Sequence, residues 1–178
     1  MHPQKRVLLG IILVGGPAVL GSYVVGLLTH SASRVAIWGG VPHEIRPVYT
    51  ISMLLAALGY FAFTYLILFR LDAGAIRIAS RFRFGLFNVL YATVLFPSTA
   101  WMPLTVAMLE RPGAGLWLAI RLVLAAVGVA SAGLVTALLS LKPRQLDRTY
   151  WLAVMGSIAF CFQTAVLDAL VWTALFPL

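Results

Sequence analysis

Arg121 and Asp168 are ionisable residues that fall inside long apolar stretches of this sequence, away from their ends. A charge at membrane depth is rare and by default marks a functional site. At about 1.5 Å per residue, the two positions lie at nearly matching depths below the same membrane surface. An ion pair between them and direct contact with a ligand are both open. A third option is that Arg121 extends to the interface while Asp168 bonds a neighbouring group.

Asp168 belongs to a face of small and polar residues. Five residues recur at helical spacings of three and four: Cys161, Thr164, Ala165, Asp168 and Trp172. Residues at these spacings share one side of a helix. A side of this kind packs on other helices or lines a cavity and does not face lipid. Gln163 lies off this face, where we expect it to bond a second helix.

Four of the five tryptophans map to the membrane half that holds Asp168, or to its adjoining loop: Trp38, Trp101, Trp117 and Trp172. A belt of tryptophans at the membrane surfaces explains three of the five without a ligand: Trp117, Trp151 and Trp172. Trp101 lies deeper, between Pro97 and Pro103, which interrupt the hydrogen bonds of a helix. Distorted backbone at membrane depth is tolerated only against protein or a water-filled cavity.

These patterns predict an aromatic pocket for a flat apolar ligand in the outer half of the membrane, opening outward. The candidate ligand-binding residues are Trp101, Asp168, Trp172, Arg121, Thr164 and Trp38. The sequence shows no Ser/His/Asp set and no Gly-rich phosphate loop, so no catalytic residue is assigned and an enzyme is not the favoured class. No metal site is assigned either, since His30, His43 and Glu44 lack a metal-binding spacing.

The elements that must position these residues are five apolar stretches, at about 6–28, 48–69, 84–109, 116–141 and 149–178. Each is long enough to cross a bilayer as a helix of about 20 residues. The chain is 62% hydrophobic with a mean hydropathy of +0.99, whereas a soluble domain is about 45–50% apolar. The sequence therefore predicts an all-α polytopic integral membrane protein, a single domain over residues 1–178 that forms a bundle of five transmembrane helices.

The basic residues predict the orientation of the bundle. Nine of the 13 lysines and arginines flank one side of the expected membrane: Lys5, Arg6, Arg70, Arg77, Arg81, Arg83, Lys142, Arg144 and Arg148. Arg34, Arg46 and Arg111 lie on the other side. Because cytoplasmic loops carry the excess of basic residues, we expect a cytoplasmic N-terminus and an external C-terminus, in a bacterial inner membrane. Topology thereby explains the net charge of +8, and no nucleic-acid partner is expected.

Small residues recur in two of the stretches. The first carries five glycines, at Gly10, Gly15, Gly16, Gly21 and Gly26. The fourth repeats the pattern at Gly128 and Gly133, among alanines. Small residues let helices approach closely in lipid, either within one bundle or across a homodimer. The loop at 29–47 is the longest, and its Gly39–Gly40 pair suits an ordered segment over the outer mouth of the bundle.

Three short elements resemble, in chain order, the tryptophan-rich sensory protein/translocator protein family (TspO/MBR): Gly16–Pro17–Ala18, Asn88 with Trp101-x-Pro103, and Leu167–Asp168. Members of that family are five-helix membrane proteins that bind porphyrins, sterols and similar apolar ligands. The resemblance implies a ligand-binding or transport-related role, a porphyrin or heme as a candidate ligand, and a homodimer as the usual assembly. The family's Pro-Tyr-x-x-Trp element is replaced here by Gly156, Ser157 and Phe160.

Two functions therefore remain open from the sequence. The first is binding or sensing of a small hydrophobic ligand, such as a porphyrin or heme, a sterol or a lipid-like molecule, in an outer-half cavity. The second is a non-catalytic subunit or assembly factor of a larger membrane complex, for which small-residue stripes and short loops are equally suitable. Membrane lipid is a partner in both.

Overall fold

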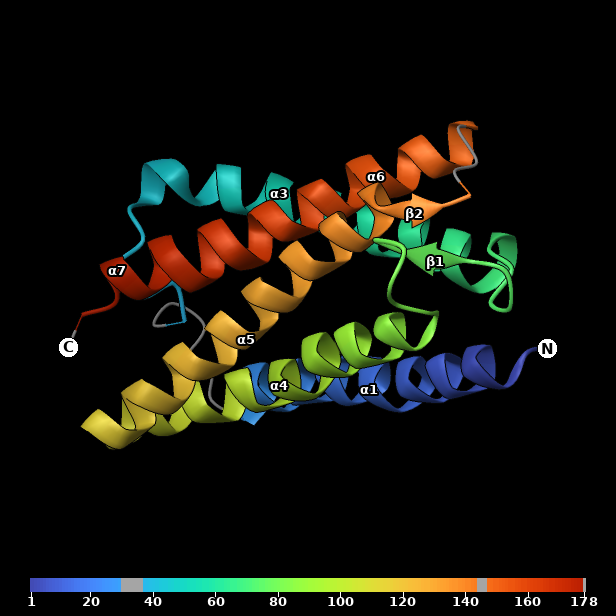
Figure 1. Ribbon diagram of the computed structural model, residues 1–178. Helices are drawn as coiled ribbons and strands as arrows, with labels where there is room; N and C mark the ends of the chain where they lie inside the picture. The colour runs from blue at the N-terminus through green and yellow to red at the C-terminus, as the bar shows by residue number, and fades with distance from the viewer. Residues whose placement is uncertain (30–36, 144–146, 178) are drawn as a thin grey trace.

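The computed structural model describes residues 1–29, 37–143 and 147–177, and this part of the chain contains five helices long and apolar enough to cross a membrane (Figure 1). They run over Pro3–Thr29, His43–Arg70, Gly85–Glu110, Ala114–Leu139 and Arg148–Leu175. The prediction of an all-α bundle of five helices is confirmed, and each helix begins and ends within a turn or two of its predicted stretch. The protein is an integral membrane protein.

Two of the five spans change their helical geometry along their length. The uniform spans are α1 (Pro3–Thr29), α4 (Gly85–Glu110) and α5 (Ala114–Leu139). The second span joins a 3-10 turn, an α-helix and a π-helical end: η1 (His43–Ile45), α3 (Arg46–Tyr65) and η2 (Leu66–Arg70). The fifth begins as an α-helix, widens into a long π-helix and tightens again: α6 (Arg148–Cys161), η3 (Phe162–Trp172) and α7 (Thr173–Leu175).

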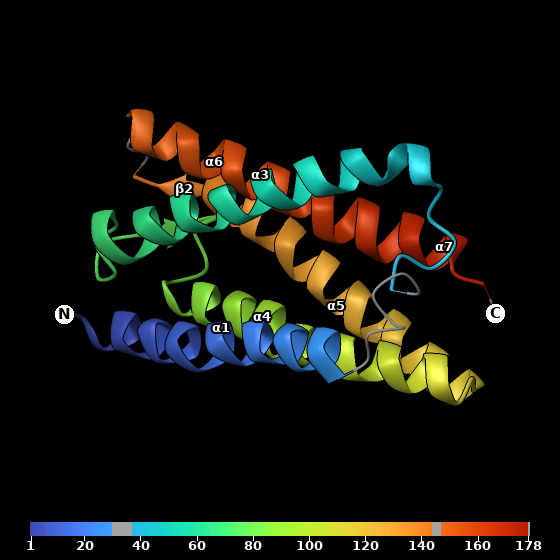
Figure 2. The same cartoon turned by 180° about the vertical axis from the view of Figure 1, so that it is seen from behind.

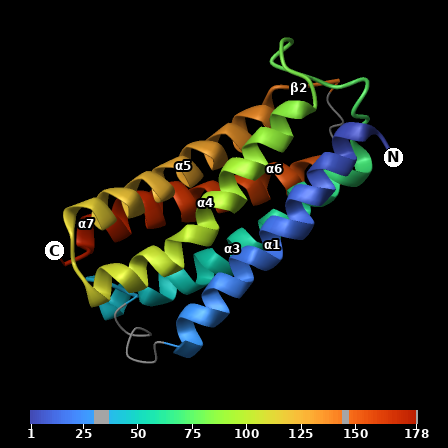
Figure 3. The ribbon, with the colours of Figure 1, turned by 90° about the horizontal axis from the view of Figure 1, so that it is seen from below.

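The spans pack as an open ring. α1 packs on α4, α4 on α5, α5 on α6 and η3, and α6 on α3, so α1 and α3 are the two ends of the ring (Figures 1 and 2). α1 meets the second span through η2, at the end of the bundle that holds the N-terminus. Among the described elements, no packing of comparable extent joins α1 to α3 itself. The termini lie at opposite ends of the bundle (Figure 3).

The buried side chains form two clusters along the bundle. The cluster nearer the N-terminal end is aromatic and aliphatic, and its fully buried members include Leu8, Phe63, Leu66, Phe87 and Leu138. The cluster nearer the C-terminal end contains Tyr49, Ile120, Trp172 and Phe176. Large apolar side chains also cover the outside of the bundle, among them Leu58, Val129 and Leu170. Such a surface has no stable place in water and matches a bilayer.

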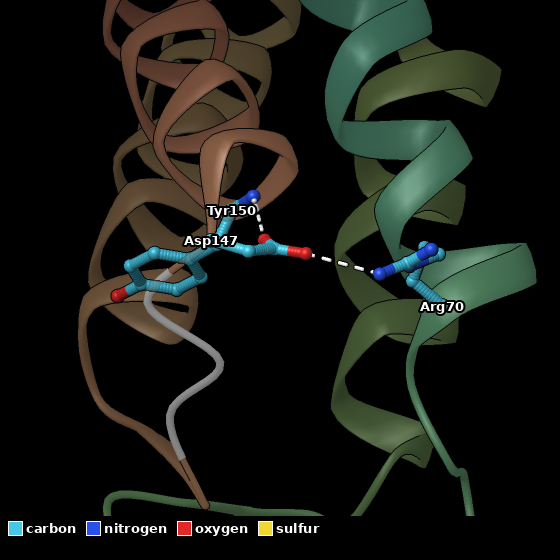
Figure 4. Close-up of polar contacts among 3 residues, drawn as sticks. All are labelled: Arg70, Asp147 and Tyr150. Atoms are coloured by element: carbon cyan, nitrogen blue, oxygen red, sulfur yellow. Dashed lines mark hydrogen bonds and ion pairs between the residues drawn. The ribbon is translucent and has the colours of Figure 1, made fainter.

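Two of the basic loops are joined by backbone pairing at the N-terminal end of the bundle. Strand β1 (Arg77–Ile78) pairs antiparallel with β2 (Leu141–Lys142), which joins the loop after the second span to the loop after the fourth. Arg70 Nη2 lies 3.0 Å from Asp147 Oδ2, and Asp147 Oδ1 accepts a hydrogen bond of 2.8 Å from the Tyr150 backbone N–H (Figure 4). Asp147 therefore caps α6 and anchors the second span to the fifth.

Small residues are used inside the bundle. A Cβ built on Gly156 of α6 would lie 2.6 Å from Gly59 Cα of α3, so the two backbones touch at this crossing. Gly15 likewise faces the Leu95 side chain. A Cβ built on Gly128 would lie 3.1 Å from the Ala165 Cα. Gly59 was not named from the sequence, and Gly156 was named there only as a departure from the TspO/MBR pattern, not as a packing position. The homodimer stays a prediction.

The orientation predicts how single cysteines react in cells. In a Cys161→Ser background, a membrane-impermeant maleimide added to intact cells should label Glu44→Cys and leave Ala75→Cys unlabelled, because Ala75 lies in the basic loop expected in the cytoplasm. Both positions are exposed. Inverted membrane vesicles serve as the control and should reverse the pattern. Labelling of Ala75→Cys in intact cells would show that the bundle is inserted the other way round.

The glycine crossing predicts a stability difference between two equivalent substitutions. Gly59→Ala should lower the free energy of unfolding by about 1–3 kcal/mol, because the added methyl overlaps the backbone of α6 at Gly156. The matched control is Gly21→Ala, which places its methyl where no atom lies within 4 Å and should be neutral or stabilising. Thermal unfolding in detergent measures both. Equal melting temperatures for the two variants would rule out a backbone-to-backbone crossing.

Candidate functional site

A cavity of about 670 Å³ lies inside the ring, with walls supplied by all five spans and by the first loop. Its volume falls within the range of about 300–1,000 Å³ that is usual for small-molecule sites. It extends from the middle of the bundle toward the C-terminal end, where α4 contributes Trp101, η3 contributes Asp168 and the loop contributes Trp38. The lining is mostly apolar, with a few polar groups that converge on the space.

Five of the six candidate residues named from the sequence line this cavity: Trp38, Trp101, Thr164, Asp168 and Trp172. The sixth, Arg121, does not. The inward face of α5 is formed by Ile120 and Leu124, which are buried, and Arg121 lies about a quarter-turn away from it on the exposed surface of the helix. Over the described residues, the ion pair found is Arg70–Asp147, and none joins Arg121 to Asp168.

The π-helical geometry of η3 brings Gln163 and Asp168 together. Gln163 Nε2 donates a hydrogen bond of 2.8 Å to Asp168 Oδ1. In an α-helix, residues five apart point to different sides, but the i→i+5 hydrogen bonds of a π-helix bring them close to one line. Gln163, which we expected to bond a second helix, therefore supports Asp168 from within the same helix. A π-helix leaves no clear mark in hydrophobic periodicity, which is why the sequence did not show this pair.

Thr164 combines two roles. It lines the cavity, and its Oγ1 lies 2.8 Å from Ser131 Oγ on α5. Ser131 in turn donates a hydrogen bond of 2.7 Å to the Gly128 carbonyl oxygen. This buried chain of hydroxyls fixes η3 against α5 and so sets the depth at which Asp168 enters the cavity.

Three residues that line the cavity each carry a buried polar atom with no hydrogen-bond partner among the described residues: Tyr60 Oη, Trp101 Nε1 and Gln163 Oε1. Leaving a buried polar atom unpaired costs about 1–3 kcal/mol, so three on the lining residues of one cavity are a strong sign of a missing partner. Tyr60 was not among the candidates from the sequence, and neither were Tyr23 and Tyr49, which also line the space. The signal was present, because a tyrosine hydroxyl inside an apolar span needs a partner.

Aromatic rings form the wall around Trp101. The Trp101 ring stacks on Tyr23 with centroids 5.5 Å apart and planes at 30°, and it meets Trp172 edge-on at 5.7 Å. Trp172 contacts Phe176 at 4.8 Å. Trp101 Nε1 remains unpaired within this wall. Flat rings with one free N–H suit a flat ligand that carries a hydrogen-bond acceptor.

The described part of the first loop, residues 37–42, is attached to the C-terminal end of the last span. Trp172 Nε1 donates a hydrogen bond of 2.9 Å to the Ile37 carbonyl oxygen. Gly39 has a positive φ of 56°, and a Cβ on Gly40 would overlap the Leu175 carbonyl oxygen. Glycine is therefore required at both positions for the loop to lie against η3 and α7. The described residues of the loop contribute Ile37 and Trp38 to the lining of the cavity.

The cavity opens sideways, between the two free ends of the ring. Four of its lining residues are also exposed on the outside of the bundle: Leu13 and Leu20 of α1, at 63% and 68%, and Met53 and Phe61 of α3, at 48% and 69%. All four are apolar and sit within membrane spans. Our expectation of an outward-facing mouth therefore changes: the described residues give an opening toward the bilayer.

The chain matches no protein-family model, no curated protein and no solved structure. Over the described residues, no group of three or more His, Cys, Asp or Glu side chains could hold a metal ion, and His30 lies outside those residues. The geometry of the cavity is thus the basis for a functional proposal.

The attachment of the first loop predicts a change in amide protection. In Gly40→Ala, the added methyl overlaps the Leu175 carbonyl oxygen, so the loop should lift and lose the Trp172–Ile37 hydrogen bond. Because such a bond contributes about 1 kcal/mol, hydrogen exchange over residues 37–42 should accelerate about fivefold. The control is Gly115→Ala at the same end of the bundle, where no atom lies within 4 Å. Unchanged exchange in Gly40→Ala would contradict the attachment.

Proposed function

We propose that this protein binds a small hydrophobic ligand in the intramembrane cavity, in a binding or sensing role. The observation that carries the proposal is the combination of an apolar space of about 670 Å³ with three unpartnered buried polar atoms on residues that line it. An empty structural cavity would be apolar throughout. A ligand with a flat apolar body and a polar end would fill the space and give these atoms their partners.

The sideways opening supports a ligand that arrives through the bilayer. Leu13 and Leu20 on one side and Phe61 on the other form an apolar rim that faces lipid tails. A molecule dissolved in the membrane can pass such a rim without losing its apolar surroundings. The porphyrin, sterol and lipid-like ligands that the resemblance to the TspO/MBR family implies all partition into membranes, and transport of such a molecule is a further option.

A second function is favoured by one feature of α1. Its glycines at positions 10 and 21 have no atom within 4 Å of an added Cβ, so the outer face of this helix presents small residues that no described element covers. Small residues are the usual contact surface for another helix in lipid. This face supports the alternative of a non-catalytic subunit or assembly factor, and also the proposed homodimer.

Tryptophan fluorescence tests the proposed binding. Titration of the protein in nanodiscs with protoporphyrin IX, heme or a fluorescent sterol should quench Trp101 and Trp172 saturably for at least one of them. Ala57→Phe, which narrows the cavity from its α3 wall, should lower the affinity for that ligand about tenfold, equivalent to about 1.4 kcal/mol. The matched control is Ala125→Phe, an exposed alanine of α5 outside the cavity lining.

Two results would count against ligand binding. One is the absence of saturable quenching by all three probes, with the Trp101→Phe variant giving the same titration curves as the parent protein. The other is an equal loss of ligand affinity in Ala57→Phe and Ala125→Phe. That result would indicate that the ligand dissolves in the lipid and does not enter the cavity. Purification in mild detergent with a stable heteromeric partner, combined with no quenching, would favour the subunit function.

A further inference from the structure

The described lining of the cavity contains an acidic side chain and no basic one. Asp168 is the one ionisable acid on the described lining, and no lysine, arginine or histidine is found there. Within the described part of the chain, two basic residues near this site in sequence or in expected depth, Arg46 and Arg121, are engaged elsewhere or face outward. Arg46 lies over the Trp38 ring at 5.4 Å and donates to the Val41 carbonyl oxygen at 3.3 Å, and Arg121 is exposed on the outer surface of α5.

The polar groups of the lining that could bond a ligand include acceptors on Gln163 and Asp168 as well as donors, the Tyr23 hydroxyl among them. Gln163 Nε2 already donates to Asp168 Oδ1, and Gln163 Oε1 has no hydrogen-bond partner among the described residues, so its lone pairs remain to be bonded. The hydroxyls of Ser98 and Tyr49 donate to the carbonyl oxygens of Val94 and Leu167. Trp101 Nε1 is a donor, and Tyr60 Oη can act either way.

We propose that Asp168 makes this cavity selective for hydrophobic ligands whose polar end is a cation, such as a protonated amine, over the same ligands ending in a carboxylate. The proposal rests on the proposed function and names the ligand class of the same site. An ammonium group carries three donors and no acceptor. It would donate to Asp168 and to Gln163 Oε1, and the second of these has no partner among the described residues.

The electrostatic argument points the same way. An ionised carboxylate in a low-dielectric site is costly unless a cation lies beside it, and the described lining supplies no cation. A ligand cation would therefore complete the ion pair that the protein lacks. A ligand carboxylate would instead meet a second acid and further acceptors, with no basic group to receive it.

The aromatic wall adds a second, independent preference for a cation. Trp101, Tyr23 and Trp172 present ring faces and edges around the cavity that also holds Asp168. Cations are attracted to the faces of tryptophan and tyrosine within about 6 Å, and this attraction is strongest where water is excluded. The protein already uses such a contact at Arg46 and Trp38. An acid beside an aromatic wall is a chemistry that recognises amines.

A matched series of probes tests the selectivity. 1-Pyrenylmethylamine, 1-pyrenylmethanol and 1-pyrenecarboxylate share one flat ring system and accept energy from tryptophan. In zwitterionic nanodiscs at pH 7, the amine should bind at least about tenfold more tightly than the carboxylate, a difference of about 1.4 kcal/mol. Asp168→Asn should weaken binding of the amine about tenfold and binding of the alcohol by a smaller factor, since the amide oxygen still accepts from a hydroxyl. Circular dichroism and the melting temperature report that the variant is folded. Asp168→Glu keeps the charge and should keep the preference.

The control for general surface charge is Glu44→Gln, which removes an exposed acid away from the cavity lining and should leave all three affinities unchanged. Equal or tighter binding of the carboxylate, or an amine preference that survives in Asp168→Asn or disappears in Glu44→Gln, would overturn the selectivity and leave ligand binding intact. Failure of all three probes to give saturable energy transfer would instead remove the proposed function, and the selectivity with it.

Discussion

A bilayer gives a polar atom nothing to bond, so each polar group within these spans needs a partner in the protein or in a bound molecule. Most of the polar side chains obey this rule locally. The Thr164 and Ser131 hydroxyls contact each other, and Tyr49 Oη donates to the Leu167 carbonyl oxygen at 2.9 Å. Of the four buried polar atoms without a partner among the described residues, three belong to residues that line the same cavity, Tyr60, Trp101 and Gln163, and the fourth is Asn88 Oδ1. That concentration distinguishes a site from a packing defect.

The same constraint explains why the cavity survives in a bundle of apolar helices. α3 is held on α6 by the backbone contact of Gly59 with Gly156, and α1 is held on α4, where Gly15 receives Leu95. These two contacts hold α1 and α3 against different helices, α4 and α6 respectively. The space left between them cannot close without breaking one of the two, so the opening toward lipid follows from where the glycines lie.

Hydropathy predicted the five spans because it depends on local composition, and the rise per residue predicted that Arg121 and Asp168 lie at nearly matching depths. The sequence did not correctly predict the direction in which two side chains point around their helix axes. Arg121 has the expected depth but faces outward, since Ile120 and Leu124 occupy the inward face. Gln163 turned toward Asp168 because η3 is π-helical. Rotation about a helix axis is set by neighbouring helices, and one sequence does not contain that information.

The outward position of Arg121 changes what the cavity can hold. A porphyrin or heme carries ionised carboxylates, and a site for such a ligand needs basic groups at its polar end. Arg121 was the one basic candidate for that role, and it lies outside the lining. What remains is Asp168 with Gln163 Oε1, a pair that accepts hydrogen bonds. A sterol hydroxyl could donate to this pair, and an amine could donate and also neutralise it. Because the ring opens to lipid and the described lining holds one carboxylate and no basic side chain, the proposed selectivity is for amphipathic cations among the molecules that a membrane dissolves.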